Sequence, residues 1–300
     1  MTAAHHEISA MHRAIALSAL GLGRTSPNPP VGCVILDPTG RVVGEGHHER
    51  KGEPHAEVHA LAAAGEHARG GTAVVTLEPC NHHGRTPPCH QALLDAGIAR
   101  TVIALIDPTS RDEGGAARLR AAGVEVEVGV LADTARLVLG PWLDSLTTGR
   151  PHVTWLYRTN PDGNPVTPTA SQVRALAAGM DVVVHADGSV VEARPNSHGA
   201  FSLPTPQPSR QPAELLAALY DGGTRTVLIA TGPSIAARFI HNGLIDRTVA
   251  HLDPVGPSHR PSTRTQPLVP TGFVVDTVTR EGHGVRVEAH RPTRQNHLPQ

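Results

Sequence analysis

The feature that most constrains this chain is one histidine, one glutamate and two cysteines that can meet at a single metal ion. They stand in His55-Ala56-Glu57, in Pro79-Cys80 and at Cys89. A hydrolytic zinc site needs three protein ligands, an open coordination position for water and a base that is not a ligand. The histidine and the cysteines can supply the ligands and the glutamate the base, so the fold has to bring separate segments to one point.

The order of these residues matches the signature of zinc deaminases, in which a His-x-Glu segment precedes a Pro-Cys-x-x-Cys segment. The spacing departs from it, because eight residues separate Cys80 from Cys89. Both ligand segments are expected at helix starts, where free backbone N–H groups favour the thiolate and neutral imidazole that a metal requires. Residues i and i+2 of a regular helix point about 200° apart. We therefore expect His55 at the cap or first turn, with Glu57 in the first turn.

Other metal arrangements remain open. His55 and His59 are spaced i, i+4 as in zincins, but zincins place a glutamate directly after the first histidine, where this chain has Ala56. A purely structural zinc would need a fourth protein ligand, for which three histidines are candidates: His82, His83 and His90. Cys33, in an apolar run, is predicted to be a buried strand thiol.

Bulk composition bounds the class of protein. The 300 residues suit two domains, and the net charge of -1 lacks the basic excess of a nucleic-acid binder. No apolar run approaches the about 20 residues of a membrane span, and the first residues lack the features of a secretory signal. Three cysteines suit no disulfide framework. We predict a cytoplasmic protein that acts on a small molecule, without nucleic-acid or membrane partners.

Hydrophobic periodicity predicts an α/β fold in both halves. The first half reads as helices over 8–20, 54–67, 91–96 and 111–122, and strands over 31–36, 41–46, 72–77, 101–106 and 124–128. After a polar linker at 147–151 come strands over 152–157, 181–185 and 226–229, and helices over 171–178, 213–220 and 234–242. Residues 192–212 read as loop, and about the last 20 residues are expected to fray.

Several motifs of the first half closely resemble the riboflavin-biosynthesis deaminase/reductase family. They are Ser26-Pro27-Asn28-Pro29-Pro30-Val31-Gly32, Gly46-His47-His48, Gly52-Glu53-Pro54-His55-Ala56-Glu57-Val58-His59-Ala60 and the segment from Thr76 to Cys89. The loop Gly84-Arg85-Thr86-Pro87-Pro88-Cys89 is specific to that family among zinc deaminases and accounts for the long cysteine spacing. The resemblance implies a cytidine-deaminase-like three-layer α/β/α domain over 1–148, a truncated dihydrofolate-reductase-like α/β domain over 149–292 and a polar tail over 293–300.

The resemblance also implies roles for individual residues. His55, Cys80 and Cys89 would bind zinc, and Glu57 would shuttle protons in the hydrolytic deamination of 2,5-diamino-6-(5-phosphoribosylamino)pyrimidin-4-one. Five further positions match those that hold the pyrimidine and the ribose phosphate: Asn28, His48, His82, Arg85 and Thr86. Arg85 can bind a phosphate through two parallel N–H donors. Asn28, between two prolines, also suits an Asx turn. Only the resemblance selects His48 over its neighbour His47.

The second half departs from the family at its reductase motifs. Leu156 stands at the position of the family's lysine, and Lys51 is the only lysine of the chain. Three further motifs are replaced, by Asn160-Pro161-Asp162-Gly163, by His185-Ala186-Asp187-Gly188-Ser189-Val190 and by Ala230-Thr231-Gly232. Asp187 places negative charge where backbone N–H groups would bind a phosphate. We expect a domain that has lost nicotinamide-cofactor binding and serves packing or homo-oligomer formation.

Four other functions compete with that of a zinc-dependent pyrimidine deaminase. They are a bifunctional deaminase/NADPH reductase, a deaminase for a related pyrimidine in a specialised pathway, a zinc-stabilised assembly module without catalysis and a nucleic-acid editing deaminase. The missing lysine disfavours the first. The intact Glu57 and cysteine loop disfavour the assembly module, and the near-zero charge and scarce aromatic residues disfavour the editing enzyme.

Overall fold

The structure is a computed structural model that describes residues 2–81, 87–110, 113–194, 211–253 and 269–292. It divides the chain into two compact units, one ending at Leu143 and the other beginning at Asp144. In the part of the chain that is described, no helix combines the length and the apolar character that a membrane span requires.

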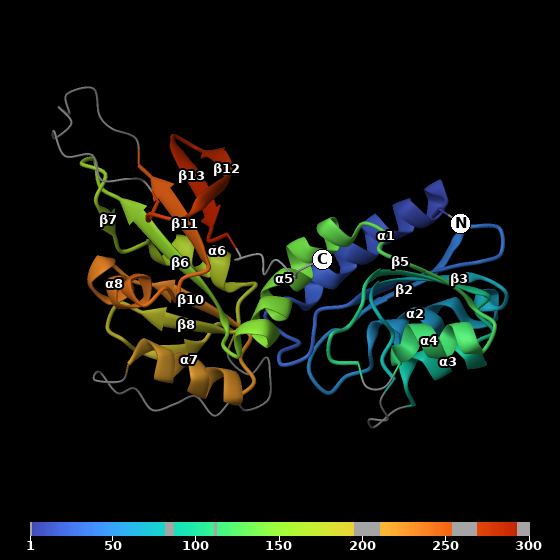
Figure 1. Ribbon diagram of the computed structural model, residues 1–300. Helices are drawn as coiled ribbons and strands as arrows, with labels where there is room; N and C mark the ends of the chain where they lie inside the picture. Colours follow the sequence, from blue (N-terminus) through green and yellow to red (C-terminus); the bar gives the residue numbers. More distant parts are fainter. Residues whose placement is uncertain (1, 82–86, 111–112, 195–210, 254–268, 293–300) are drawn as a thin grey trace, which may run out of the picture. The chain divides into compact units, whose positions relative to one another are not determined.

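The first unit is built on a five-stranded sheet in the order β2-β1-β3-β4-β5 (Figure 1). β1 pairs antiparallel with β2 and β3, whereas β3, β4 and β5 run parallel. Every residue of β1 is buried, because both faces of the sheet are covered. The strands are β1 (Gly32–Leu36), β2 (Val42–His47), β3 (Thr72–Leu77), β4 (Arg100–Leu105) and β5 (Glu125–Val128).

Helices cover both faces of this sheet. A Cβ atom on Gly32 would lie 2.0 Å from the Ala14 oxygen of α1, and one on Gly46 would lie 2.5 Å from the Ala56 oxygen of α2. Gly46 pairs with Cys33, the neighbour of Gly32, so α1 and α2 lie on opposite faces. This is the expected α/β/α layering. The helices are α1 (His5–Ser18), α2 (Ala56–Ala64), α3 (Cys89–Asp95), α4 (Gly114–Ala121) and α5 (Ala132–Thr148), and α5 extends into the second unit.

The second unit has an eight-stranded sheet in the order β12-β13-β11-β6-β10-β8-β9, with β7 paired to β6 (Figure 1). Tyr157 of β6 packs with the α7 and α8 side chains, whereas its neighbour Leu156 packs with α6 on the other face. The helices are α6 (Ala170–Ala177), α7 (Pro212–Asp221) and α8 (Pro233–His241). The strands are β6 (His152–Thr159), β7 (Pro165–Val166), β8 (Val182–His185), β9 (Val190–Glu192), β10 (Thr226–Ala230), β11 (Arg247–Leu252), β12 (Val274–Glu281) and β13 (Gly284–His290).

Two sequence-based expectations at the ends of elements were wrong. Residues 284–290, which were expected to fray, form β13, because this strand pairs with both β11 and β12 and buries Val287 and Ala289. The expected linker at 147–151 begins inside α5, which continues through Thr148 and closes with a bond from Gly149 N to the Ser145 oxygen. Most of the expected loop at 192–212 and the tail 293–300 lie outside the described residues.

Candidate metal centre

His55 stands at the start of α2, as expected from the sequence. It is the N-cap residue, with an extended backbone (φ -73°, ψ 165°), and Glu57 lies in the first turn. Gly46 of β2 makes this placement possible, because a Cβ atom there would lie 2.5 Å from the Ala56 oxygen. The helix can therefore begin directly against the sheet, with its first side chains pointing toward the ends of β3 and α3.

The structure brings His55, Cys80 and Cys89 together. Their ligand atoms all lie within 4.8 Å of one another, and this is the group that could hold a metal among the described residues. His55 Nδ1 lies 3.6 Å from Cys80 Sγ and 3.3 Å from Cys89 Sγ. Zinc bonds of about 2.3 Å to sulfur and about 2.05 Å to nitrogen, at a tetrahedral angle, separate the two donors by about 3.6 Å. The three side chains fit one tetrahedral zinc ion.

Local hydrogen bonds favour the thiolate that zinc requires at Cys80, whereas the bond with Cys80 raises the pKa of His55, against the neutral imidazole expected from the sequence. Bonds from Cys89 and His55 lower the pKa of Cys80 to about 4. The Cys89 backbone N–H, at the first position of α3, donates to Cys80 Sγ at 3.3 Å. The hydrogen bond to Cys80 and burial raise the pKa of Cys89, so the pair retains one proton, on Cys89. Binding of a divalent metal would release that proton.

Glu57 lies buried beside the three ligand side chains. It is 3% exposed, and burial raises its pKa to about 7. It also forms a hydrogen bond with Cys89, which places its carboxyl next to the metal ligands. A carboxyl with such a pKa can both accept and release a proton near neutral pH. Cys33 of β1 is fully buried near Glu57, in agreement with its predicted place as a strand thiol.

Asn28 and His48 form a polar pair next to His55. The rings of His48 and His55 meet edge to face, with centroids 5.4 Å apart. His48 Nδ1 donates to the Pro54 oxygen at 3.1 Å, so Nε2 accepts from Asn28 Nδ2 at 3.3 Å. This arrangement orients Asn28 Oδ1 as an acceptor. Burial lowers the pKa of His48 and keeps it neutral, and His48 rather than His47 meets the His55 ring.

The other candidate residues either lie outside the described part of the chain or do not belong to the metal-binding group. His82, Arg85 and Thr86 lie outside the described residues, as does His83. His90 Nδ1 lies 3.2 Å from the Cys80 backbone oxygen, so this residue binds the main chain beside the site. Neither His90 nor His59 belongs to the metal-binding group among the described residues.

Glu78 is a residue of this site that the sequence analysis missed. It directly precedes Pro79-Cys80, is 5% exposed and accepts hydrogen bonds from three groups between residues 107 and 116. Its position before the metal-ligand segment was the available signal. The groups that it binds are mostly backbone N–H groups, whose partners no residue pattern reveals.

Comparisons with known proteins agree with this geometry. A family model for the cytidine and deoxycytidylate deaminase zinc-binding region matches residues 5–105, and a model for the RibD C-terminal domain matches residues 174–271. The riboflavin biosynthesis protein RibD of Mycobacterium tuberculosis (strain ATCC 25618 / H37Rv) is 38% identical over 291 residues, covering 82% of this chain and 84% of its own. The first unit therefore carries a zinc-binding region.

Two further similar proteins cover different lengths of the chain. The diaminohydroxyphosphoribosylamino-pyrimidine deaminase of Buchnera aphidicola (subsp. Acyrthosiphon pisum, strain APS) is 48% identical over 147 residues, which is 49% of this chain and 99% of that protein. A diaminohydroxyphosphoribosylaminopyrimidine deaminase/5-amino-6-(5-phosphoribosylamino)uracil reductase from Thermotoga maritima has a similar crystal structure. Its TM-score is 0.80 at 25% identity, covering 96% of this chain and 99% of the other.

Proposed function

Because this chain belongs to the RibD family of riboflavin-biosynthesis proteins, we propose that its first unit deaminates 2,5-diamino-6-(5-phosphoribosylamino)pyrimidin-4-one. The observation that carries the proposal is the meeting of His55, Cys80 and Cys89 beside the buried carboxyl of Glu57. A relative of about half the length, which matches only this unit, bears the name of that deaminase. The reaction adds water at the ring carbon, breaks its bond to the amino nitrogen and releases ammonia.

The residues of the site divide this reaction between them. His55, Cys80 and Cys89 would hold zinc, and a bound zinc ion supplies the Lewis acidity that makes water a nucleophile near pH 7. Glu57 takes the proton that the attacking water loses and delivers it to the departing amino group. Asn28 Oδ1, oriented by His48, accepts a hydrogen bond from an N–H of the pyrimidine. His82, Arg85 and Thr86 complete the proposal as contacts of the ring and the ribose phosphate.

The test is ammonia release by the zinc-loaded protein from this substrate, with cytidine and deoxycytidylate as comparison substrates. We expect turnover of the phosphoribosylaminopyrimidine and none of the other two. Turnover of only a different pyrimidine would instead indicate a deaminase of a specialised pathway. Bound zinc without turnover of any of them would leave a zinc-stabilised assembly module and contradict the proposal.

We further propose that the second unit does not bind a nicotinamide cofactor. Leu156, at the position of the family's lysine, is completely buried against α6. Asp187 Oδ1 accepts the Ser189 backbone N–H at 2.9 Å, so a carboxylate already uses a donor of the loop that would bind a phosphate. Pro233 begins α8 and removes one of the N–H groups that a helix N-terminus offers to an anion.

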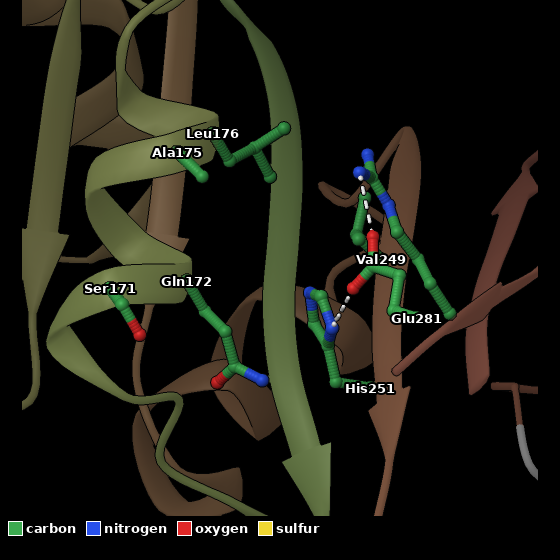
Figure 2. Close-up of a pocket in the computed structure, with 8 residues that line it drawn as sticks. Ser171, Gln172, Ala175, Leu176, Val249, His251 and Glu281 are labelled. Atoms are coloured by element: carbon green, nitrogen blue, oxygen red, sulfur yellow. Dashed lines mark hydrogen bonds and ion pairs between the residues drawn. The ribbon is translucent and has the colours of Figure 1, made fainter. Parts of the chain in front are cut away.

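A pocket of about 280 Å³ in this unit lies beside Leu156, whose strand partner Val249 lines it (Figure 2). His251 of β11 and Arg286 of β13 line it and both bind Glu281, at 3.1 and 3.5 Å, opposite Gln172 of α6. The charges of the pocket therefore compensate one another. None of its lining residues belongs to the four replaced motifs.

Titration with NADPH, followed by nucleotide fluorescence, tests this second proposal. We expect no saturable binding and no NADPH oxidation when the deaminated product is supplied. The Thermotoga maritima deaminase/reductase, assayed in parallel, serves as the positive control. Micromolar binding with turnover would show instead that the chain is bifunctional.

We also propose that the protein forms a homo-oligomer through β12. Among the described residues β12 is an outer strand of its sheet, all eight of its residues are exposed, and Val278 is 66% exposed. Antiparallel pairing of two copies about Val278 would set Asp276 opposite Arg280 of the second copy, which joins opposite charges. An exposed strand edge of this kind is a ready template for pairing.

Sedimentation equilibrium tests this pairing. The wild type should be dimeric or larger, and Val278→Lys should shift it toward the monomer, because the pairing would bury two like charges face to face. Leu137→Lys, at a residue 80% exposed in the first unit, is the matched control and should leave the mass unchanged. A monomeric wild type would overturn the proposal.

The cysteines support a reducing compartment. Cys80 and Cys89 are free thiols at the centre of the site, and Cys33 is a buried free thiol. Oxidation of the first pair would remove two metal ligands. We therefore propose that the protein works in the cytoplasm, where thiols stay reduced.

A further inference from the structure

Glu78 occupies a buried position between the end of β3 and the metal ligand Cys80. Its backbone N–H still bonds the Leu105 oxygen at the end of β4, and the chain then turns at Pro79. The carboxylate accepts the Asp107 N–H at 3.3 Å, the Ser110 hydroxyl at 3.0 Å and the Ala116 N–H at 2.9 Å. Three donors from the β4–α4 loop and the first turn of α4 thus converge on one side chain.

The start of α4 fits closely against Glu78 and Pro79. A Cβ atom at Gly114, where φ is +76°, would lie 2.4 Å from Glu78 Oε1. A Cβ atom at Gly115 would lie 1.9 Å from the Pro79 oxygen. Two successive glycines therefore allow α4 to touch both residues that precede Cys80, and this contact fixes where the turn leaves the sheet.

The opposite side of Cys80 is held by α3. The Cys80 oxygen accepts the His90 backbone N–H at 3.5 Å and His90 Nδ1 at 3.2 Å. Cys80 Sγ accepts the Cys89 N–H at 3.3 Å. Cys80 thus lies between α3, which bonds it directly, and α4, which contacts the two residues before it, Glu78 and Pro79.

We propose that Glu78 is a positioning residue that sets the place of the Cys80 sulfur for metal binding. The inference rests on the proposed zinc-dependent function but concerns metal affinity, which can be measured without substrate. A carboxylate suits the position because it offers only acceptors, and the groups that meet there are donors. Glutamine keeps one acceptor but turns an N–H₂ group toward either Ala116 N–H or Asp107 N–H. Alanine removes all three bonds.

The test compares zinc affinity, by competition with a chromophoric chelator, in the wild type, Glu78→Gln and Glu78→Ala. Loss of a residue that supports a metal ligand costs about 10–100-fold in affinity, so Glu78→Ala should weaken binding by that factor and Glu78→Gln by less. Cobalt substitution supplies an independent signature, because the thiolate-to-cobalt absorption should change in Glu78→Ala. If Glu78→Ala does not fold, Glu78→Gln alone decides, with weakened affinity expected.

Glu7→Ala is the matched control for general destabilisation. Glu7 is another buried carboxylate of the same unit, 3% exposed, and it bonds Ala4 N–H and Arg100 at the opposite end of β4 from Glu78. This variant should lose thermal stability and keep wild-type zinc affinity. Wild-type affinity in both Glu78 variants, or an equal loss in Glu7→Ala, would overturn the proposal. A wild type that binds zinc but does not deaminate would contradict the proposed function and leave this inference standing.

Discussion

Glu57→Gln is expected to abolish deamination while zinc remains bound. The amide has the shape of the carboxyl but cannot take the proton that the attacking water loses. Removing a general acid–base group costs about 10²–10⁴-fold in rate, and here one residue serves both proton transfers, so the loss in kcat should lie at the upper end. The measurements are ammonia release from the phosphoribosylaminopyrimidine and the zinc content of the same preparation.

Glu53→Gln is the matched control for this variant. Glu53 lies four residues before Glu57 and is partly exposed, where it pairs with Arg50 at 3.0 Å. A partly exposed pair of this kind contributes little to stability, so its loss should leave both zinc content and kcat unchanged. Wild-type turnover in Glu57→Gln would exclude the proton shuttle. Zinc loss in that variant would mean that Glu57 supports the metal site instead of the chemistry.

The strands of the first unit were predictable because their apolar runs are short and end at clear turn signals. The prediction of a strand over 72–77 coincides with β3, and the hairpin strands lie within a residue of β1 and β2. The helix α5 was not predicted. Gly140 and Pro141 stand in its middle and are typical of a break, but Ala135, Leu139 and Trp142 are buried on one side. Packing of that face outweighs the local preference.

The strands β12 and β13 were missed for a different reason, the polar character of their segment. About the last 20 residues are polar on average, which favoured a frayed end. In the structure β13 alternates buried Val287 and Ala289 with Arg286 and Glu288, and these two charged residues pair with each other at 2.7 Å. The alternation of apolar and charged residues therefore predicts this strand better than the average polarity of the segment does. β12 has no such pattern because all of its residues are exposed.

The metal ligands and the base of the candidate site could be predicted better than the contacts that hold Cys80 in place. Residue type and order selected His55, Cys80, Cys89 and Glu57, because few residue types bind zinc or move protons. The support of Cys80 depends on Glu78 and on N–H groups that any residue except proline carries. Such contacts follow from the path of the backbone, so they became visible only in the folded chain.

Cys89→Ala is expected to remove zinc binding and, with it, all turnover. Two ligands would remain, His55 and Cys80, whereas zinc sites of this kind use three protein ligands. The loss in affinity should exceed the about 10–100-fold that loss of a supporting residue costs. Zinc binds the folded state, so added zinc should raise the melting temperature of the wild type and leave that of Cys89→Ala unchanged.

Cys33→Ala is the control that distinguishes loss of a zinc ligand from loss of a buried thiol. Cys33 is as buried as Cys89, but it lies in β1 and is not part of the metal-binding group. Its replacement leaves a small cavity, so this variant should melt at a lower temperature and still gain stability when zinc is added. If Cys89→Ala kept the zinc-dependent gain, or if Cys33→Ala lost it, the two thiols that bind the metal would have to be reassigned. The zinc dependence of the melting temperature, rather than its absolute value, identifies the ligand.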